Sequence, residues 1–318
     1  MFTAKSWPIG AALLQPPNVT PAGVSVQDAD ASEWATVLGE VRHAGFDHVD
    51  LTDTWLRPGD LSEERLKELR GVLDKAGLGV TAISTVRYSV IDPDPELADA
   101  NVSYLHRTLE AAVALDTGVV SVGLHRPLTA AQQAAEWFWV EPGACDPVGD
   151  TATWNLAVER LRSLGEHAAR LGVQVSLELY EDTYLGTTAS ALALVADIGL
   201  PNVGLNPDVG NLIRQHRPVE DWEDILRQTL PVTNYWHIKN YFRSFDPRTG
   251  AYFTMPASAE EGLINYRRAI EMAVACGFDG PICVEHYGGD GLTRSARNRD
   301  YLRELLAEKL GEHDDGDR

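Results

Sequence analysis

Residues 205–211 read Leu205-Asn206-Pro207-Asp208-Val209-Gly210-Asn211, a short apolar start that runs directly into an aspartate and an asparagine. Three other stretches have the same form: Val175-Ser176-Leu177-Glu178-Leu179-Tyr180, Tyr235-Trp236-His237-Ile238-Lys239-Asn240 and Ile282-Cys283-Val284-Glu285-His286. Each is a strand-like run that ends on an acid or a histidine. Four strands that finish on such side chains predict a chemical site at one end of a sheet.

Strand-like and helix-like segments alternate on both sides of these stretches. Strands are expected at residues 9–14, 48–51, 79–84, 119–124, 173–179, 203–206, 233–238 and 281–285. Helices are expected at residues 32–43, 62–77, from 95 onward, 151–171, 188–198, 219–230, 263–276 and 295–310, with Ser32 and Thr151 or Thr153 as N-caps. Eight strand-then-helix units without a linker predict an α/β fold, a (β/α)8 TIM barrel. The alternative, a doubly wound open sheet, lacks the Gly-x-Gly-x-x-Gly turn after its first strand.

The barrel is expected to be a single domain over residues 1–311, with a long loop after strand four at about residues 125–150. A loop of this length is usually functional or disordered. The run Glu136-Trp137-Phe138-Trp139 within it is too aromatic for a disordered segment. Residues 312–318, rich in acids, are expected to form a disordered tail.

Composition excludes several classes of partner. The net charge of −20 argues against nucleic acid, because a duplex-binding surface needs clustered Lys and Arg. No stretch reaches the roughly 18 apolar residues of a membrane span, and no signal peptide is visible at the start. Three cysteines are too few for a disulfide framework and favour a reducing compartment. The expected location is the cytoplasm.

The carboxyl ends of parallel barrel strands open onto one face, where the chemistry takes place. Glu178, Asp208, His237 and Glu285 each lie at or next to that end of strands five to eight. Any one of them alone would more often be a hydrogen-bonded or salt-bridged rim residue. Three converging carboxylates, however, repel one another unless a cation lies among them. The set therefore predicts a divalent metal, with Mn²⁺ preferred and Mg²⁺, Co²⁺ or Zn²⁺ as alternatives.

Other side chains are candidates for the same mouth. His125 follows strand four directly and could be a second base or acid titrating near neutrality, or a histidine bonded to backbone. Arg126 comes next and is a candidate for substrate binding. Lys239 lies two residues beyond His237, on the same face of the strand, and is expected to hold a substrate oxygen or a carboxylate.

Aromatic residues form a further group. Trp55 and Trp137, with Phe138 and Trp139, are candidates for an apolar wall over a bound ring. The alternative is that they pack the loop against the rim of the barrel.

The ligand set resembles that of the xylose-isomerase-like TIM barrels of the sugar phosphate isomerase/epimerase type. Glu178, Asp208 with Asn211, His237 and Glu285 carry the resemblance, which extends over about residues 30–305. It implies the barrel fold, a metal site and a carbohydrate substrate. It also implies that these enzymes commonly assemble, so an oligomer is expected.

The resemblance extends to individual roles. In the keto-sugar 3-epimerases of this group, the first and last glutamates bind Mn²⁺ and exchange a proton with the substrate, which implies an acid/base pair of Glu178 and Glu285. An arginine six residues after the histidine implies substrate binding by Arg243. Asn211, which we expect to bind the substrate, stands where these epimerases have a histidine. Tyr184 stands where they have a glutamate. These departures put a plain keto-hexose epimerase in question.

We therefore expect a divalent-metal-dependent enzyme that removes a proton next to the carbonyl of a keto-sugar and epimerises or isomerises it through an enediolate. The alternative is a C-glycoside deglycosidase-type lyase, in which the same enolate of a 3-oxo-glycoside expels the aglycone. His125-Arg126, the aromatic loop and Gly288-Gly289-Asp290-Gly291 resemble the catalytic subunits of those bacterial enzymes, which work with a small β-rich partner subunit. A DNA-repair nuclease on the same fold is disfavoured by the charge, and a non-catalytic barrel by the intact ligand set.

Overall fold

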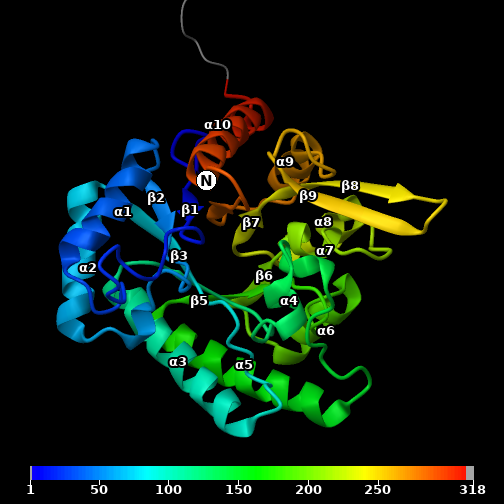
Figure 1. Ribbon diagram of the computed structural model, residues 1–318, viewed down its shortest axis with the longest axis horizontal. Helices are drawn as coiled ribbons and strands as arrows, with labels where there is room; N and C mark the ends of the chain where they lie inside the picture. Colours follow the sequence, from blue (N-terminus) through cyan, green and yellow to red (C-terminus); the bar gives the residue numbers. More distant parts are fainter. Residues whose placement is uncertain (1, 313–318) are drawn as a thin grey trace, which may run out of the picture.

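Eight parallel strands form the barrel wall in the computed structural model, which describes residues 2–312 (Figure 1). The strands are β1 (Ile9–Ala12), β2 (His48–Asp50), β3 (Gly79–Ser84), β4 (Val119–Val122), β5 (Gln174–Glu178), β6 (Val203–Asn206), β7 (Trp236–Ile238) and β10 (Ile282–Val284). They are hydrogen-bonded in the order β6-β5-β4-β3-β2-β1-β10-β7. The predicted (β/α)8 barrel is confirmed, with each of the eight expected strands in place.

The two ends of this order, β6 and β7, meet at a seam with few backbone bonds. One parallel bridge joins Leu205 to Thr233, and the backbone N–H of Asn234 donates to the Leu205 carbonyl at 3.2 Å. Farther along, the backbone N–H of His237 donates to the side chain of Asn206, at 2.7 Å from Oδ1. A side-chain amide thus takes the place of a ladder bond where the barrel closes.

Helices surround the wall, as the alternation predicts. The longer ones are α1 (Ala31–His43), α2 (Glu63–Ala76), α3 (Pro95–Ala114), α5 (Thr151–Leu171), α6 (Thr188–Ile198), α8 (Trp222–Thr229), α9 (Tyr266–Ala275) and α10 (Gly291–Leu310). Shorter ones are α4 (Ala130–Ala134), α7 (Val209–Ile213) and the 3-10 turns η1 (Pro58–Asp60), η2 (Phe138–Val140) and η3 (Leu230–Val232). The predicted caps of α1 and α5 are wrong: Asp30 and Asp150 cap these helices, because their carboxylates accept the free backbone N–H groups of the first turn.

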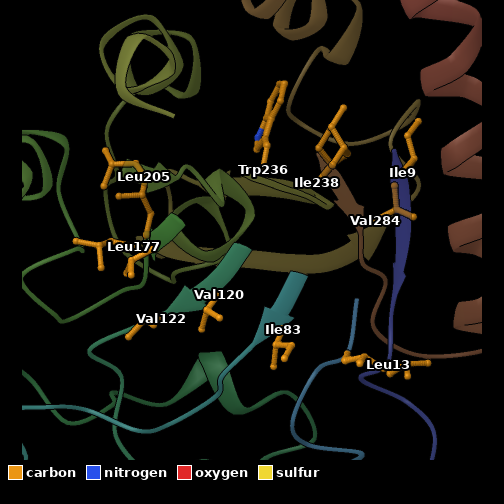
Figure 2. Packing of buried hydrophobic residues seen from close by; sticks show 14 of the residues in the cluster. Ile9, Leu13, Ile83, Val120, Val122, Leu177, Leu205, Trp236, Ile238 and Val284 are labelled. Atoms are coloured by element: carbon orange, nitrogen blue, oxygen red, sulfur yellow. The ribbon is translucent and has the colours of Figure 1, made fainter. Parts of the chain in front are cut away.

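The apolar core lies between the strands and the helices. Figure 2 shows Leu177, Trp236, Ile238 and Val284 among its buried members. Because side chains alternate along a strand, His237 points to the opposite side of β7 from Trp236 and Ile238. The same alternation that anchors the wall in the core therefore turns the polar residues of the predicted site into the barrel.

An element that the sequence analysis did not anticipate follows β7. Residues 240–257 form an antiparallel hairpin of β8 (Asn240–Asp246) and β9 (Ala251–Ala257), which projects from the barrel (Figure 1). The predicted loop after β4 is irregular except for α4 and η2.

The domain boundary at residue 311 stays a prediction, and within the predicted tail residues 313–318 lie outside the described residues. Across residues 2–312, no helix is both long and apolar enough to cross a membrane.

Candidate active site

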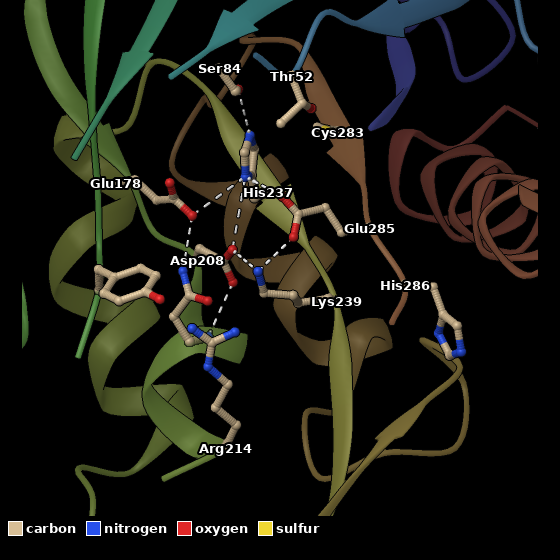
Figure 3. A network of polar contacts seen from close by, with 12 residues as sticks. Thr52, Ser84, Glu178, Asp208, Arg214, His237, Lys239, Cys283, Glu285 and His286 are labelled. Atoms are coloured by element: carbon tan, nitrogen blue, oxygen red, sulfur yellow. Dashed lines mark hydrogen bonds and ion pairs between the residues drawn. The ribbon is translucent and has the colours of Figure 1, made fainter. Parts of the chain in front are cut away.

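The four predicted ligands lie together inside the carboxyl end of the barrel (Figure 3). Glu178 is the last residue of β5, His237 lies within β7, and Glu285 follows β10. Asp208 follows β6 and is the N-cap of α7. One donor atom from each lies within 4.8 Å of all the others, and all four residues are buried.

The imidazole of His237 faces the three carboxylates with its Nδ1 atom. Nδ1 is 2.8 Å from Oε1 of Glu285. It is 3.7 Å from Oε1 of Glu178 and 3.8 Å from Oδ2 of Asp208. The carboxylates thus converge on one point beside the ring.

Lys239 lies beside the same carboxylates, as predicted from its position two residues after His237 on one face of the strand. Its Nζ atom is 2.7 Å from Oδ2 of Asp208 and 2.6 Å from Oε2 of Glu285. Within the described part of the chain, Oδ2 of Asp208 accepts no well-directed hydrogen bond and has the ammonium as its close polar neighbour. One ammonium leaves the three carboxylates with an excess of negative charge.

The electrostatics of the carboxylates reflect this crowding. Burial, with the charges of Glu285 and Glu178, raises the pKa of Asp208 to about 7 against the opposing effect of Lys239. Burial would also raise the pKa of Glu285, but Lys239 and His237 outweigh it and bring that pKa to about 2. For Glu178, His237 overcomes burial and holds the pKa below its usual range. An oxygen-rich set with one imidazole and an unsatisfied carboxylate oxygen fits a small divalent cation.

Asn211 completes the turn that begins at Asp208. Its backbone N–H donates to Oδ1 of Asp208 at 3.3 Å, the usual N-cap bond. Its side-chain Nδ2 donates to Oε1 of Glu178 at 2.9 Å and to the carbonyl of Leu179 at 3.0 Å. The spacing of three residues therefore brings the amide against a predicted ligand, one turn of α7 away from Asp208.

The other ring nitrogen of His237 faces a separate group of polar residues. Oγ of Ser84 lies 3.2 Å from Nε2 and donates to Oδ2 of Asp50 at 2.7 Å. Asp50 also accepts from the hydroxyl of Thr52, at 2.9 Å, and from the hydroxyl of Tyr235. This buried group fixes the ring from behind, and the sequence analysis did not identify it.

His125 lies at the end of β4, buried, with its ring stacked on Tyr180 at 4.3 Å between centroids. Its ring folds back over Gly123, where a Cβ would lie 2.2 Å from Nδ1. Burial lowers the pKa of His125 to about 3. The expectation that it titrates near neutrality is therefore wrong, because the site excludes the water that would stabilise its charged form.

Arg126 and Arg243, both predicted to bind substrate, have other partners in the structure. Arg126 donates to Oδ1 of Asp146 at 3.3 Å and to the Cys145 carbonyl, within the loop after β4. Arg243 donates to the carbonyl of Ile213 at 2.7 Å and to two further backbone carbonyls. Neither guanidinium forms a hydrogen bond or ion pair with the four ligands, so the structure does not bring these two residues into the cluster.

The aromatic loop lies over the mouth of the barrel. Trp139 is buried, donates its indole N–H to Oγ1 of Thr254 at 3.1 Å, and packs edge-on against Tyr241 and Tyr287. Trp137 stacks on Trp139 at 4.9 Å, against Gly288, where a Cβ would lie 2.8 Å from its ring. The loop thus docks onto the β8–β9 hairpin and the segment after β10. Trp55, which follows β2, is 2% exposed and belongs to the same buried apolar cluster as Trp139.

A buried ion pair beneath this loop escaped the sequence analysis. Arg214 donates from Nε and Nη2 to the carboxylate of Glu181, at 2.8–3.0 Å. Phe138 and Tyr180 place their rings 4.7 and 5.2 Å from the guanidinium carbon. Glu181 follows strand five closely, and Arg214 follows Asn211 closely. These positions near the carboxyl ends of the strands were the signal in the sequence that both residues lie close to the site.

A family model described as xylose isomerase-like TIM barrel matches residues 38–306. The chain belongs to this family. Among curated relatives, the ketose 3-epimerase of Arthrobacter globiformis is 24% identical over 300 residues, which cover 90% of this chain and 89% of the relative. The D-psicose 3-epimerase of Agrobacterium fabrum is 23% identical over 218 residues, 64% of this chain and 68% of the relative.

A solved structure shows the family architecture at higher similarity. A xylose isomerase-like TIM barrel protein from Mycobacterium smegmatis, crystallised in complex with magnesium, is 43% identical, with a TM-score of 0.93. The match covers 98% of this chain and 100% of that one. The chain therefore shares its fold over nearly its whole length with a protein that was crystallised in complex with magnesium.

Proposed function

We propose that this protein is a divalent-metal-dependent enzyme that epimerises or isomerises a keto-sugar. The observation that carries the proposal is the convergence of three buried carboxylates on one nitrogen of His237, within 4.8 Å. The similarity to ketose 3-epimerases supports a small sugar as the substrate. The chemistry requires a carbonyl in the sugar, because that group makes the neighbouring proton acidic.

Glu178, Asp208, His237 and Glu285 would hold the metal, and we propose Mn²⁺ as the physiological ion. When bound, the metal supplies a Lewis acid that polarises the carbonyl and orients the neighbouring hydroxyl. The similar M. smegmatis protein was crystallised in complex with magnesium, which supports a hard divalent ion for this chain. Asn211 would keep Glu178 in place through the bond to its Oε1 atom.

Glu178 and Glu285 would exchange the proton. The low pKa values of both glutamates keep them ionised at neutral pH, so either can accept a proton, and the one that returns a proton must first take one up from solvent. The ionised glutamate would remove the proton next to the carbonyl and leave an enediolate, and the protonated glutamate would give its proton to the opposite face of the same carbon, which yields the epimer. The proton left on the first glutamate would then return to solvent. Lys239, at 2.6 Å from Glu285, would orient that carboxylate and hold a sugar oxygen. The low pKa of His125 makes its ring a weak proton acceptor, so we propose that it contributes a hydrogen bond to the sugar through Nδ1, which has no partner among the described residues.

The aromatic loop would exclude water during the reaction. Trp139 and Phe138 cover the mouth in the structure, and the four ligands are less than 8% exposed. Water exclusion strengthens electrostatic interactions and protects a reactive intermediate. We propose that Trp137, stacked on Trp139, and Trp55 contribute to the apolar surroundings of the sugar.

The test is an incubation of the Mn²⁺-loaded protein with neutral ketoses in D₂O, followed by NMR. We expect an epimer, with deuterium at the inverted carbon. Glu178→Gln should abolish both signals, while Glu166→Gln, on the exposed face of α5, should leave them unchanged. Absence of exchange with every ketose would contradict the proposal. Release of an aglycone from a 3-oxo-C-glycoside, without formation of an epimer from any ketose, would show that the protein catalyses elimination instead of epimerisation.

An oligomer, a small β-rich partner subunit and a cytoplasmic location stay predictions. Size-exclusion chromatography with light scattering measures the first, and co-purification from the native source identifies the second.

A further inference from the structure

We propose that Arg214 binds an oxygen of the sugar and that its partner Glu181 makes this subsite selective for an unphosphorylated sugar. This inference rests on the proposed function, since it concerns the substrate of the same site. It assigns a binding role to a pair of residues outside the predicted ligand set.

Arg214 is fully buried and only partly satisfied. Its Nε and Nη2 atoms donate to Glu181, but among the described residues Nη1 has no hydrogen-bond partner. Leaving a buried donor unsatisfied costs about 1–3 kcal/mol, and more for a charged group. The missing acceptor is therefore expected to come from a ligand.

The guanidinium points into the site. In Figure 3 the side chain of Arg214 rises toward Asp208 and Lys239. The hydroxyl of Tyr241 lies beside Arg214, which opposes the rise in the pKa of Tyr241 caused by burial. Neither Nη1 nor this hydroxyl has a well-directed hydrogen-bond partner within residues 2–312. Nη1 can only donate, whereas the tyrosine hydroxyl donates and accepts. A donor next to such a hydroxyl suits a sugar, whose hydroxyl groups do both.

Aromatic rings line the same place. The guanidinium carbon lies 4.7 Å from the ring of Phe138, 5.2 Å from Tyr180 and 5.4 Å from Trp139. Such rings favour the apolar face of a sugar ring and keep water away from Nη1. The aromatic loop thus contributes to the subsite as well as covering it.

The loop that carries Arg214 is held from behind. Oγ1 of Thr254 donates to the carbonyl of Arg214 at 2.8 Å, and Arg243 donates to the carbonyl of Ile213 at 2.7 Å. Arg243 is therefore a positioning residue here. The sugar contact that was predicted for Arg243 is therefore assigned to Arg214, because the guanidinium of Arg214 has a free N–H donor and faces the four ligands.

Charge balance decides the class of sugar. Arg214 is neutralised by Glu181, and Lys239 by Asp208 and Glu285. Recognition of a phosphate needs cations whose charge is not already compensated. Glu181 would repel such a dianion at the site of the free Nη1 donor. A neutral hydroxyl or carbonyl oxygen meets no such repulsion.

The remaining cations near the loop are also engaged. Arg126 pairs with Asp146, at 3.3 Å. Arg87 donates to the Arg126 carbonyl at 2.9 Å and to the hydroxyl of Tyr180 at 3.1 Å, with Phe138 under its guanidinium. Arg87 has no carboxylate partner in the described part of the chain, so it is the cation through which a phosphate could still bind, and tighter binding of the phosphates by the wild type would reveal this.

The experiment compares D-fructose, D-tagatose and D-psicose with fructose 6-phosphate and tagatose 6-phosphate, by calorimetry on the Mn²⁺-loaded protein. We expect the wild type to bind at least one neutral sugar about tenfold more tightly than any phosphate. Glu181→Gln should reduce or reverse this preference by about tenfold, because it releases the charge of Arg214. The double variant Arg214→Met/Glu181→Met should weaken binding of the neutral sugar about tenfold and raise KM more than it lowers kcat.

Folding and metal content are measured on the same samples. Replacement of both members of a buried pair by apolar residues is often tolerated, so the double variant should keep its melting temperature and its metal. Arg299→Met, a buried arginine of α10 far along the chain from the site, is the matched control and should leave sugar binding unchanged.

Each result separates this inference from the proposed function. Tighter binding of the phosphates by the wild type, no binding of any neutral sugar, or unchanged binding in the double variant would overturn the role of Arg214. If the wild type epimerises a ketose and the Arg214 variants bind and convert it equally well, this inference alone is overturned. Binding that depends on Arg214 without turnover would contradict the epimerase and support the subsite.

Discussion

The two sides of the His237 ring differ in how completely their polar groups are paired. Behind Nε2, Asp50 accepts hydrogen bonds from the hydroxyls of Thr52, Ser84 and Tyr235. In front of Nδ1, Asp208 has one backbone N–H bond and a single ammonium beside it. Both aspartates are fully buried. The protein thus satisfies one carboxylate internally and leaves the other dependent on something it binds.

This difference separates structure from function within one barrel. A carboxylate with a full set of donors holds a neighbouring ring in place, in the way that outer partners orient metal-binding histidines. A carboxylate among other carboxylates is unfavourable until a cation arrives. The comparison therefore predicts that the same isosteric change mainly affects metal affinity on one side and mainly affects stability on the other.

The largest effect is expected for Asp208→Asn. We expect the affinity for Mn²⁺ to fall more than about 100-fold, because removal of a directly bound carboxylate exceeds the 10–100-fold loss typical of an outer partner. The metal-free protein should keep its free energy of unfolding within about 1 kcal/mol, since one repelling charge is gone. Calorimetric titration and urea unfolding measure the two quantities. Retention of wild-type Mn²⁺ affinity would remove Asp208 from the ligand set.

A smaller effect on metal binding and a larger one on stability are expected for Asp50→Asn. The three hydroxyl donors would lose their charged acceptor, which should lower the free energy of unfolding of the metal-free protein by about 2 kcal/mol. The Mn²⁺ affinity should fall about tenfold, because His237 loses its support. Equal effects of the two substitutions on both quantities would break the comparison.

The pH dependence of stability tests a third buried carboxylate, outside both sets. Asp53 accepts from the backbone N–H of Val86 at 2.8 Å and from the hydroxyl of Tyr104 at 3.1 Å, and burial raises its pKa to about 8. The folded state therefore keeps a proton that the unfolded chain releases above its own pKa of 3.8. Stability should fall as pH rises from about 4 to 8, by at most about 1.4 kcal/mol per pH unit. In Asp53→Asn that slope should flatten in urea unfolding curves, and an unchanged slope would show that Asp53 is ionised in the folded protein.

The sequence was sufficient for the barrel and for the four-residue cluster, because each of these residues lies within or just after a short run whose strand character is strong. It was insufficient for Arg243, since a spacing of six residues does not determine where a side chain points on a hairpin. The turn Asp246-Pro247-Arg248-Thr249-Gly250 was the unused signal for that hairpin. Glu181 and Arg214 meet only through tertiary packing, and the low pKa of His125 follows from burial, which no local pattern encodes.

The seam between β6 and β7 gives the metal ligands a second consequence. Asp208 follows one strand of the seam and His237 lies in the other, where few backbone bonds join the barrel. An ion bound by both residues would link β6 to β7 across this seam and would replace some of the missing backbone hydrogen bonds. Amide hydrogen exchange should then be fastest near this seam in the metal-free protein and slow there when Mn²⁺ binds, while the β1–β2 side exchanges alike in both. Metal content would in that case set the local opening of the barrel as well as its chemistry.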